Sequence, residues 1–227
     1  MNLPVPLQYY QTVCNTFRAK GNPDYAQQQI RYMRHQFEFF GLPMPQWMPL
    51  TRELHAAHGI PENDDLKALV RLCFEDDHRE LHYFALETVQ KTLKNQPADF
   101  IDFLEELICT RSWWDSVDWI AKLVGIHFKK HPTLIHPVTE RWMDSGNMWL
   151  QRVSLIFQLS YREKTDTDLL FSNIRRLAGS QEFFIQKGAG WALRQYAKTN
   201  PDAVQEFVGS TKLAPLTRRE ALKNMPK

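Results

Sequence analysis

One carboxylate in this sequence stands beside an indole, at a spacing that would let the two act together. Trp114 and Asp118 are four residues apart, so on a helix they point the same way, one turn from each other. A carboxylate held there could stabilise positive charge on a bound molecule. The alternative for Asp118 is an ion pair with Lys122, worth roughly a few tenths of a kcal/mol. We favour the chemical interpretation because Trp114 accompanies the acid.

A second indole, Trp191, lies within a row of cations. The helix predicted over residues 181–198 carries its apolar residues on one face. The opposite face carries Lys187, Trp191, Arg194 and Lys198. Such a row suits the phosphates of a polyanion, with an aromatic ring among them. The alternative is that Trp191 packs against a neighbouring helical repeat.

Arg152 is a permanently charged residue in apolar surroundings. Its neighbours on the same predicted helix include Leu155, Ile156 and Leu159. A guanidinium in such surroundings needs a partner, because an unpaired buried charge is costly. That partner is either a carboxylate of the adjacent helical repeat or a phosphate, and the sequence leaves both open.

Further residues that suit phosphates lie in both halves of the chain. Arg218 and Arg219 directly follow Thr217, and Thr217 with Glu220 predicts a capping box at a helix start. Cations in a first turn oppose the helix dipole, whereas phosphates bound there would be favoured. Tyr32, between two arginines, could reach the same surface.

The elements that position these residues are all predicted to be helices. Only nine glycines occur, no run alternates strictly between apolar and polar residues, and apolar positions recur at helical spacing throughout. We expect helices of about 10–18 residues with short connections. The breaks fall at Gly41–Pro49, Gly59–Asp65, Lys94–Asp99, His131–Thr133, Ser145–Asn147, Gly179–Ser180, Asn200–Asp202 and Leu213–Thr217.

A repeat relates three of the predicted helix starts. Trp114, Trp149 and Phe184 follow one another at intervals of 35 residues. This is close to the length of two-helix solenoid repeats, which stack because one unit cannot bury its apolar face alone. We therefore predict an all-α solenoid with an extended concave, basic groove. No low-complexity linker interrupts the chain, so we expect residues 1–227 to form a single domain.

Composition and charge narrow the class of protein. The 227 residues are 43% hydrophobic and 24% charged, which excludes disorder. No apolar stretch approaches the ~20 residues of a membrane span, and residues 1–10 lack the features of a signal peptide, so we expect a cytoplasmic protein that acts at the nucleoid. Three widely spaced cysteines fit a reducing compartment.

The net charge of +2 hides an asymmetry. Residues 1–110 hold 10 Lys and Arg against 15 Asp and Glu, whereas residues 111–227 hold 18 against 11. The second half would attract a polyanion, although chance segregation on a solvated surface gives the same pattern.

Other polar clusters predict no further chemistry. The eight histidines form no metal-binding pattern with carboxylates, and His78 with His82 is expected to be a surface pair. Residues 75–77, three acids in a row, are expected to form a solvated turn. Glycine-rich phosphate loops and nucleophilic serine motifs are absent.

Four segments share a pattern with one known family. They read SWWDSVD at 112–118, NMWLQR at 147–152, EFFIQK at 182–187 and YAKTNP at 196–201. With Gly190 and Trp191, they resemble the AlkD family of DNA alkylation-repair glycosylases. The likeness extends from about residue 26 to the C-terminus.

The resemblance implies a fold, an activity and roles for single residues. The fold would consist of HEAT-like repeats, and the activity would be monofunctional removal of N3- and N7-alkylated purines, such as 3-methyladenine and 7-methylguanine, in base excision repair. It also implies no metal or cofactor, no lyase activity and no flipping of the lesion into a pocket. Asp118 would be the catalytic acid, Trp114 and Trp191 would flank the lesion, and Arg152 would complete the active site.

On this interpretation the partner is double-stranded DNA that contains alkylated purines, bound by a monomer without a membrane or an obligate protein partner. Arg152 would hold a flanking phosphate. The remaining backbone contacts would be Tyr32, Lys187, Arg194, Lys198, Arg218 and Arg219.

A helical-repeat scaffold that binds protein, or that binds DNA without chemistry, is the competing interpretation, because fold alone does not decide function. A plain DNA-binding protein gains nothing from a carboxylate beside Trp114. A protein-binding scaffold has no need of cations spaced for phosphates. Base release and the salt dependence of binding would separate the three.

Overall fold

The computed structural model describes residues 5–223 and 225. Within them the regular structure is helical, with no strand beyond an isolated bridge between Glu38 and His78. The prediction of an all-α chain is confirmed. The chain divides into two compact units, Met1–Gln96 and Pro97–Lys227, so a single domain over residues 1–227 stays a prediction. Among the described helices, none combines the length and the apolar character that a membrane crossing requires.

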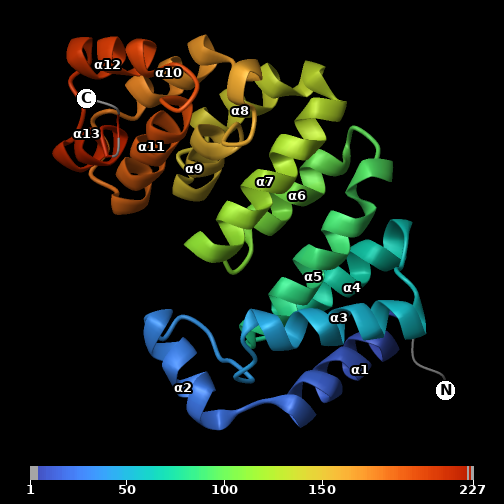
Figure 1. The fold of residues 1–227 in the computed structure, drawn as a ribbon. Helices are drawn as coiled ribbons and strands as arrows, with labels where there is room; N and C mark the ends of the chain where they lie inside the picture. The colour runs from blue at the N-terminus through green and yellow to red at the C-terminus, as the bar shows by residue number, and fades with distance from the viewer. Residues whose placement is uncertain (1–4, 224, 226–227) are drawn as a thin grey trace. The chain divides into compact units, whose positions relative to one another are not determined.

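The first unit consists of α1 to α5 and a short 3-10 turn (Figure 1). In it α1 packs on α3 and α4, and α5 packs on the same two helices. The helices are α1 (Val5–Lys20), α2 (Pro23–Tyr32), α3 (Met44–His58), α4 (Asn63–Glu75) and α5 (Arg79–Thr92). The predicted break at residues 41–49 is too long: Pro45 lies in the first turn of α3, where a proline loses no helical hydrogen bond, and the helix continues through Pro49.

One expectation for the first unit is wrong and another holds only in part. His82 is fully buried, where its ring contacts the Arg79 guanidinium (Nη1 to Nδ1, 2.7 Å), so it is not half of a surface pair. The acidic turn at residues 75–77 is only partly solvated, because Asp76 accepts hydrogen bonds from the Tyr10 hydroxyl and from the backbone of His78 (2.8 Å). These polar groups join α1 to the α4–α5 connection.

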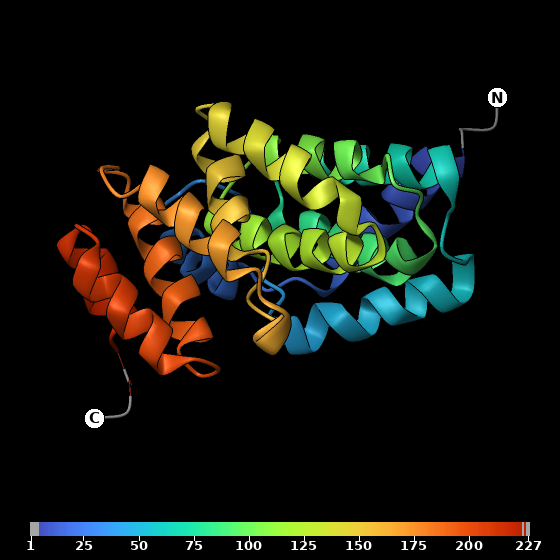
Figure 2. The same cartoon turned by 90° about the horizontal axis from the view of Figure 1, so that it is seen from above.

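The second unit is a two-layer stack of helix pairs (Figure 1, Figure 2). The odd-numbered helices α7, α9, α11 and α13 pack on one another in that order, and the even-numbered helices lie outside them. We call α7, α9, α11 and α13 the inner helices. The elements are α6 (Phe100–Cys109), α7 (Trp114–Lys130), α8 (Ile135–Asp144), α9 (Met148–Ile156), α10 (Thr167–Arg176), α11 (Phe183–Tyr196), α12 (Pro201–Ser210) and α13 (Pro215–Ala221).

The starts of three inner helices agree with the predicted repeat to within a residue. They fall at Trp114, Met148 and Phe183. At α9 the start is fixed by Asn147, whose side-chain oxygen accepts the N–H groups of Trp149 (2.9 Å) and Leu150 (3.3 Å). The helical-repeat prediction is thus confirmed, while the concave basic groove remains a prediction.

Glycines allow the inner helices to approach closely. A methyl group at Gly125 of α7 would lie 2.3 Å from the carbonyl oxygen of Phe157, just after α9. One at Gly190 of α11 would lie 2.5 Å from Cβ of Glu220 on α13. At Gly188 the methyl group would meet Nη1 of Arg152 at 3.1 Å, so this glycine makes room for a charged side chain between α9 and α11.

The sequence predicts no break between residues 147 and 179, yet α9 ends at Ile156 and α10 begins at Thr167. Neither glycine nor proline occurs in between. The connection is held by the Gln158 amide, which accepts the N–H of Asp166 (2.7 Å) and donates to its carbonyl (3.2 Å). Arg162 adopts a left-handed backbone conformation, with φ of 54°.

Candidate active site

Asp118 and Arg152 form an ion pair between two neighbouring inner helices. Arg152 donates from Nε to Oδ1 of Asp118 (2.8 Å) and from Nη2 to Oδ2 (2.9 Å). The Arg152 side chain is only 6% exposed, whereas that of Asp118 is 20% exposed. Nη1 of Arg152 donates to the carbonyl oxygen of Phe184 in α11. One guanidinium therefore connects α7, α9 and α11 and fixes both oxygens of the carboxylate.

This geometry decides between the two partners that the sequence leaves open for Arg152. The partner is a carboxylate of the adjacent repeat, namely Asp118. The guanidinium is buried and each of its three nitrogens donates within the protein, whereas its role as a contact to a flanking phosphate stays a prediction. What fixes Asp118 is this two-bond contact, not the simple ion pair with Lys122.

Burial raises the pKa of the Asp118 carboxyl above its usual range, and Arg152 opposes this shift. The nearby Asp115 adds to the increase. Arg152 is thus the group that favours the ionised form in a half-buried place. Each carboxylate oxygen uses one lone pair on Arg152, so acceptor capacity is left for water or a bound molecule.

Both candidate indoles are half-buried. Trp114 is the first residue of α7, and Trp191 lies in the second half of α11. That they flank a lesion, as the resemblance implies, stays a prediction.

An aromatic cluster that the sequence did not predict joins the N-terminal ends of α7, α9 and α11. It consists of Trp113, Trp149 and Phe184, with ring centroids 6.1 Å apart for the two indoles and 5.4 and 5.1 Å from each indole to Phe184. The guanidinium carbon of Arg152 lies 5.9 Å from the centre of the Phe184 ring. Phe184 therefore supports Arg152 with both its carbonyl group and its ring.

Two of the predicted phosphate-binding cations are held by an acid. Lys187 Nζ lies 2.9 Å from Oε1 of Glu220, and Arg194 Nη1 lies 2.7 Å from Oε2. These hydrogen bonds lower the pKa of Glu220 to about 2. Lys187 and Arg194 thus carry less net charge toward DNA than the sequence suggests, and their role as phosphate contacts stays a prediction.

The predicted capping box is wrong. Helix α13 begins at Pro215 after Ala214, and the Thr217 hydroxyl donates to the carbonyl oxygen of Gln186 (3.1 Å). A proline at the first helical position sets the start, so Thr217 lies inside the helix. Arg218 and Arg219 consequently occupy the last turn, where cations suit the helix dipole.

The other predicted contacts remain exposed. Arg219, Arg218 and Lys198 are all on the surface, where Arg218 donates to the carbonyl oxygen of Val208 (2.8 Å) and Lys198 to the side chain of Gln195 (2.9 Å). Tyr32 belongs to the first unit and is 71% exposed. In the part of the chain that the structure describes, no group of three or more His, Cys, Asp or Glu side chains is arranged to hold a metal ion.

Replacing Glu220 by Gln should reduce stability at pH 7 by about 1–3 kcal/mol, because two charge-assisted hydrogen bonds weaken. A pKa lowered from 4.5 to about 2 means that the contribution is complete above pH 4.5 and is lost as the pH falls through 2. Urea unfolding at pH 7 and near pH 2 measures the difference. The exposed Glu206→Gln is the control, and a wild-type-like Glu220→Gln at pH 7 would contradict the prediction.

The sequence and the fold of this chain are similar to those of known proteins. Residues 13–225 match the family described as DNA alkylation repair enzyme. A solved structure described as "Predicted DNA alkylation repair enzyme from Enterococcus faecalis" shares 33% identity, covering 91% of this chain and 97% of that one, with a TM-score of 0.86. No curated protein matches the chain.

Two structures from Streptococcus mutans are similar at 17% identity. One is AlkD2, with a TM-score of 0.62 over 80% of this chain and 91% of that chain. The other is smu.31 of strain UA159, with a TM-score of 0.61 over 79% and 98%. At this identity the likeness concerns the fold, and it agrees with the helical repeats described above.

Proposed function

We propose that this chain, which belongs to the DNA alkylation repair enzyme family, is a DNA glycosylase that hydrolyses the N-glycosidic bond of cationic N3- and N7-alkylated purines in duplex DNA. The observation that carries the proposal is the partly exposed Asp118 carboxylate, fixed by the buried Arg152. We further propose that it acts as a monomer in the cytoplasm.

The proposed chemistry needs only one carboxylate. An N3- or N7-alkylated purine is already cationic, so its departure does not require the general acid of ordinary glycoside hydrolysis. As the glycosidic bond lengthens, positive charge develops on the deoxyribose. Asp118 would stabilise that charge and position the attacking water with the acceptor sites that Arg152 leaves unused.

The indoles and the buried guanidinium have separate parts in this proposal. Trp114 and Trp191 would offer their ring faces to the cationic nucleotide, at about 0.5–2 kcal/mol each. Arg152 would act as a positioning residue, since it holds the Asp118 carboxylate. Selectivity would then rest on the charge and lability of the lesion instead of an enclosing pocket.

The test is base release by purified protein from duplexes that carry 7-methylguanine, 3-methyladenine or uracil. We expect release of the two cationic bases, an intact abasic strand and no release of uracil. Uracil provides the neutral control. Efficient uracil release without 7-methylguanine release would overturn the proposal.

A non-catalytic helical-repeat scaffold for DNA or protein remains the second candidate. The observation that favours it is that Asp118 belongs to an ion pair between helices, as a purely structural acid would. Salt-sensitive duplex binding without any base release would support an inert DNA-binding protein, and salt-insensitive behaviour would support a protein scaffold.

A further inference from the structure

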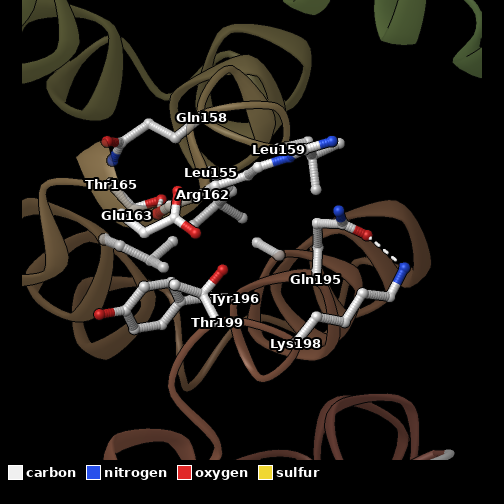
Figure 3. A pocket seen from close by; sticks show the side chains of 12 residues that line it. Leu155, Gln158, Leu159, Arg162, Glu163, Thr165, Gln195, Tyr196, Lys198 and Thr199 are labelled. Atoms are coloured by element: carbon white, nitrogen blue, oxygen red, sulfur yellow. Dashed lines mark hydrogen bonds between the residues drawn. The ribbon is translucent and has the colours of Figure 1, made fainter.

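A cavity of about 310 Å³ lies between the α9–α10 connection and the end of α11, within the second unit (Figure 3). Its apolar lining includes Leu155, Leu159 and Ala192. Its polar lining includes Arg162, Gln195 and Lys198. Asp118 and Arg152 do not line it, so the proposed chemistry does not explain this cavity.

The cavity lies at the opposite end of the inner helices from Asp118. The cluster of Trp113, Trp149 and Phe184 brings the N-terminal ends of α7, α9 and α11 together. The contact of Gly125 with Phe157 does the same for the later parts of α7 and α9. These three helices therefore run in the same direction, and their C-terminal ends share one edge.

Cations line up along this edge. Lys129, in the last turn of α7, lies 4.5 Å from the ring centre of Tyr161, whose hydroxyl donates to the carbonyl of Gly125 (2.7 Å). Arg162 follows Tyr161 in the chain and lines the same cavity as Lys198, which comes just after α11. Exposed cations thus lie in the last turn of α7, after α9 and after α11, and packed helices lie about 8–10 Å apart.

Within the cavity these side chains make a set that suits one anionic group. In Figure 3, Arg162 and Lys198 extend toward the same side, with the Gln195 amide between them, while Glu163 lies toward the other side. The Gln195 oxygen accepts a hydrogen bond from Lys198 (2.9 Å), which directs its N–H₂ group elsewhere as a donor. A guanidinium, an ammonium and an amide donor are the groups that bind a phosphate.

We propose that Arg162 and Lys198, with Lys129 beside them, hold phosphates of the DNA backbone at this edge. The inference rests on the proposed action on duplex DNA. It is supported by the pairing of Lys187 and Arg194 with Glu220, which reduces the charge of the row that the sequence favours. DNA would then be gripped by its backbone at the C-terminal edge of the inner helices, apart from the carboxylate that acts on the lesion.

The experiment is the salt dependence of binding to an undamaged duplex, measured by fluorescence anisotropy. For Arg162→Gln with Lys198→Gln we expect the slope of log affinity against log salt to fall by about 2, one for each lost phosphate contact. The control with the same change of charge is Arg175→Gln with Lys212→Gln, an exposed arginine of the outer helix α10 and an exposed lysine just before α13, and it should keep the wild-type slope. Equal slopes in both double variants would overturn the proposal.

Two further measurements separate this proposal from its alternatives. The first is base release by the wild type: if it releases no base but the salt slope still falls in the Arg162→Gln, Lys198→Gln variant, the backbone contact stands and the glycosylase proposal fails. Inorganic phosphate, tested against chloride at equal ionic strength, probes the other source of the same chemistry. One outcome would overturn the DNA contact and assign the cavity to a free phosphate. In it, phosphate raises the Tm of the wild type but not that of the variant, while the salt slopes of duplex binding are equal in the two proteins.

Discussion

Replacing Asp118 by Asn is expected to slow base release by roughly 10²–10³-fold while duplex affinity stays within about twofold of wild type. The substitution keeps the shape of the side chain and removes the charge that would stabilise the developing sugar cation. Single-turnover release of 7-methylguanine measures the rate, and anisotropy measures binding. Asp102→Asn, on the outer helix α6, makes the same chemical change away from the site and should keep the wild-type rate.

The loss of Asp118 also leaves the Arg152 guanidinium without its anion, which can reduce stability by about 3–5 kcal/mol. Rates are therefore compared at a temperature where thermal unfolding shows both proteins to be folded. An unchanged rate in folded Asp118→Asn would make the acid a structural partner of Arg152 and would end the catalytic proposal.

Replacing Arg152 by Lys should reduce base release by about 10²-fold, although the positive charge is kept. A lysine cannot donate to both oxygens of Asp118 and to the Phe184 carbonyl at once, so the carboxylate would lose its fixed orientation. The weaker partner should also raise the pKa of Asp118 further, because Arg152 is what opposes the effect of burial.

The pH profile distinguishes positioning from phosphate binding. Protonation of Asp118 removes the required charge, so the rate falls as the pH decreases, and in Arg152→Lys this fall should occur at a higher pH than in wild type. The salt dependence of duplex binding should stay unchanged. A variant with a flatter salt slope and an unmoved pH profile would return Arg152 to the role of a phosphate contact.

The sequence predicted the starts of three inner helices but not the partners of their charged side chains. Helical periodicity and the 35-residue interval identify the inner helices because both reflect burial along one face. The repeat also placed Asp118 and Arg152 on neighbouring helices, but which of two partners Arg152 takes depends on side-chain geometry. The interval of 34 residues between them, close to one repeat, was the available signal.

Three further features of the structure could not be predicted from the types of the residues that form them. The Phe184 contact with Arg152 uses a backbone carbonyl, which every residue has. The end of α9 depends on the Gln158 amide and not on a glycine or proline, so breaker rules do not find it. Glu220 was assigned to its own helix cap because capping rules are local, whereas its partners lie on α11.

The glycines between the inner helices have a consequence for how this protein can change over time. Where backbone or Cβ atoms already limit the approach at Gly125 and Gly190, a single added methyl group must tilt one helix against the next. Every later repeat would then be rotated by the same angle, so its displacement would increase with its distance from the substituted helix. If the second unit binds duplex DNA as proposed, substitutions at these two positions would therefore change which bent or straight duplexes it fits without changing any of the proposed contact residues.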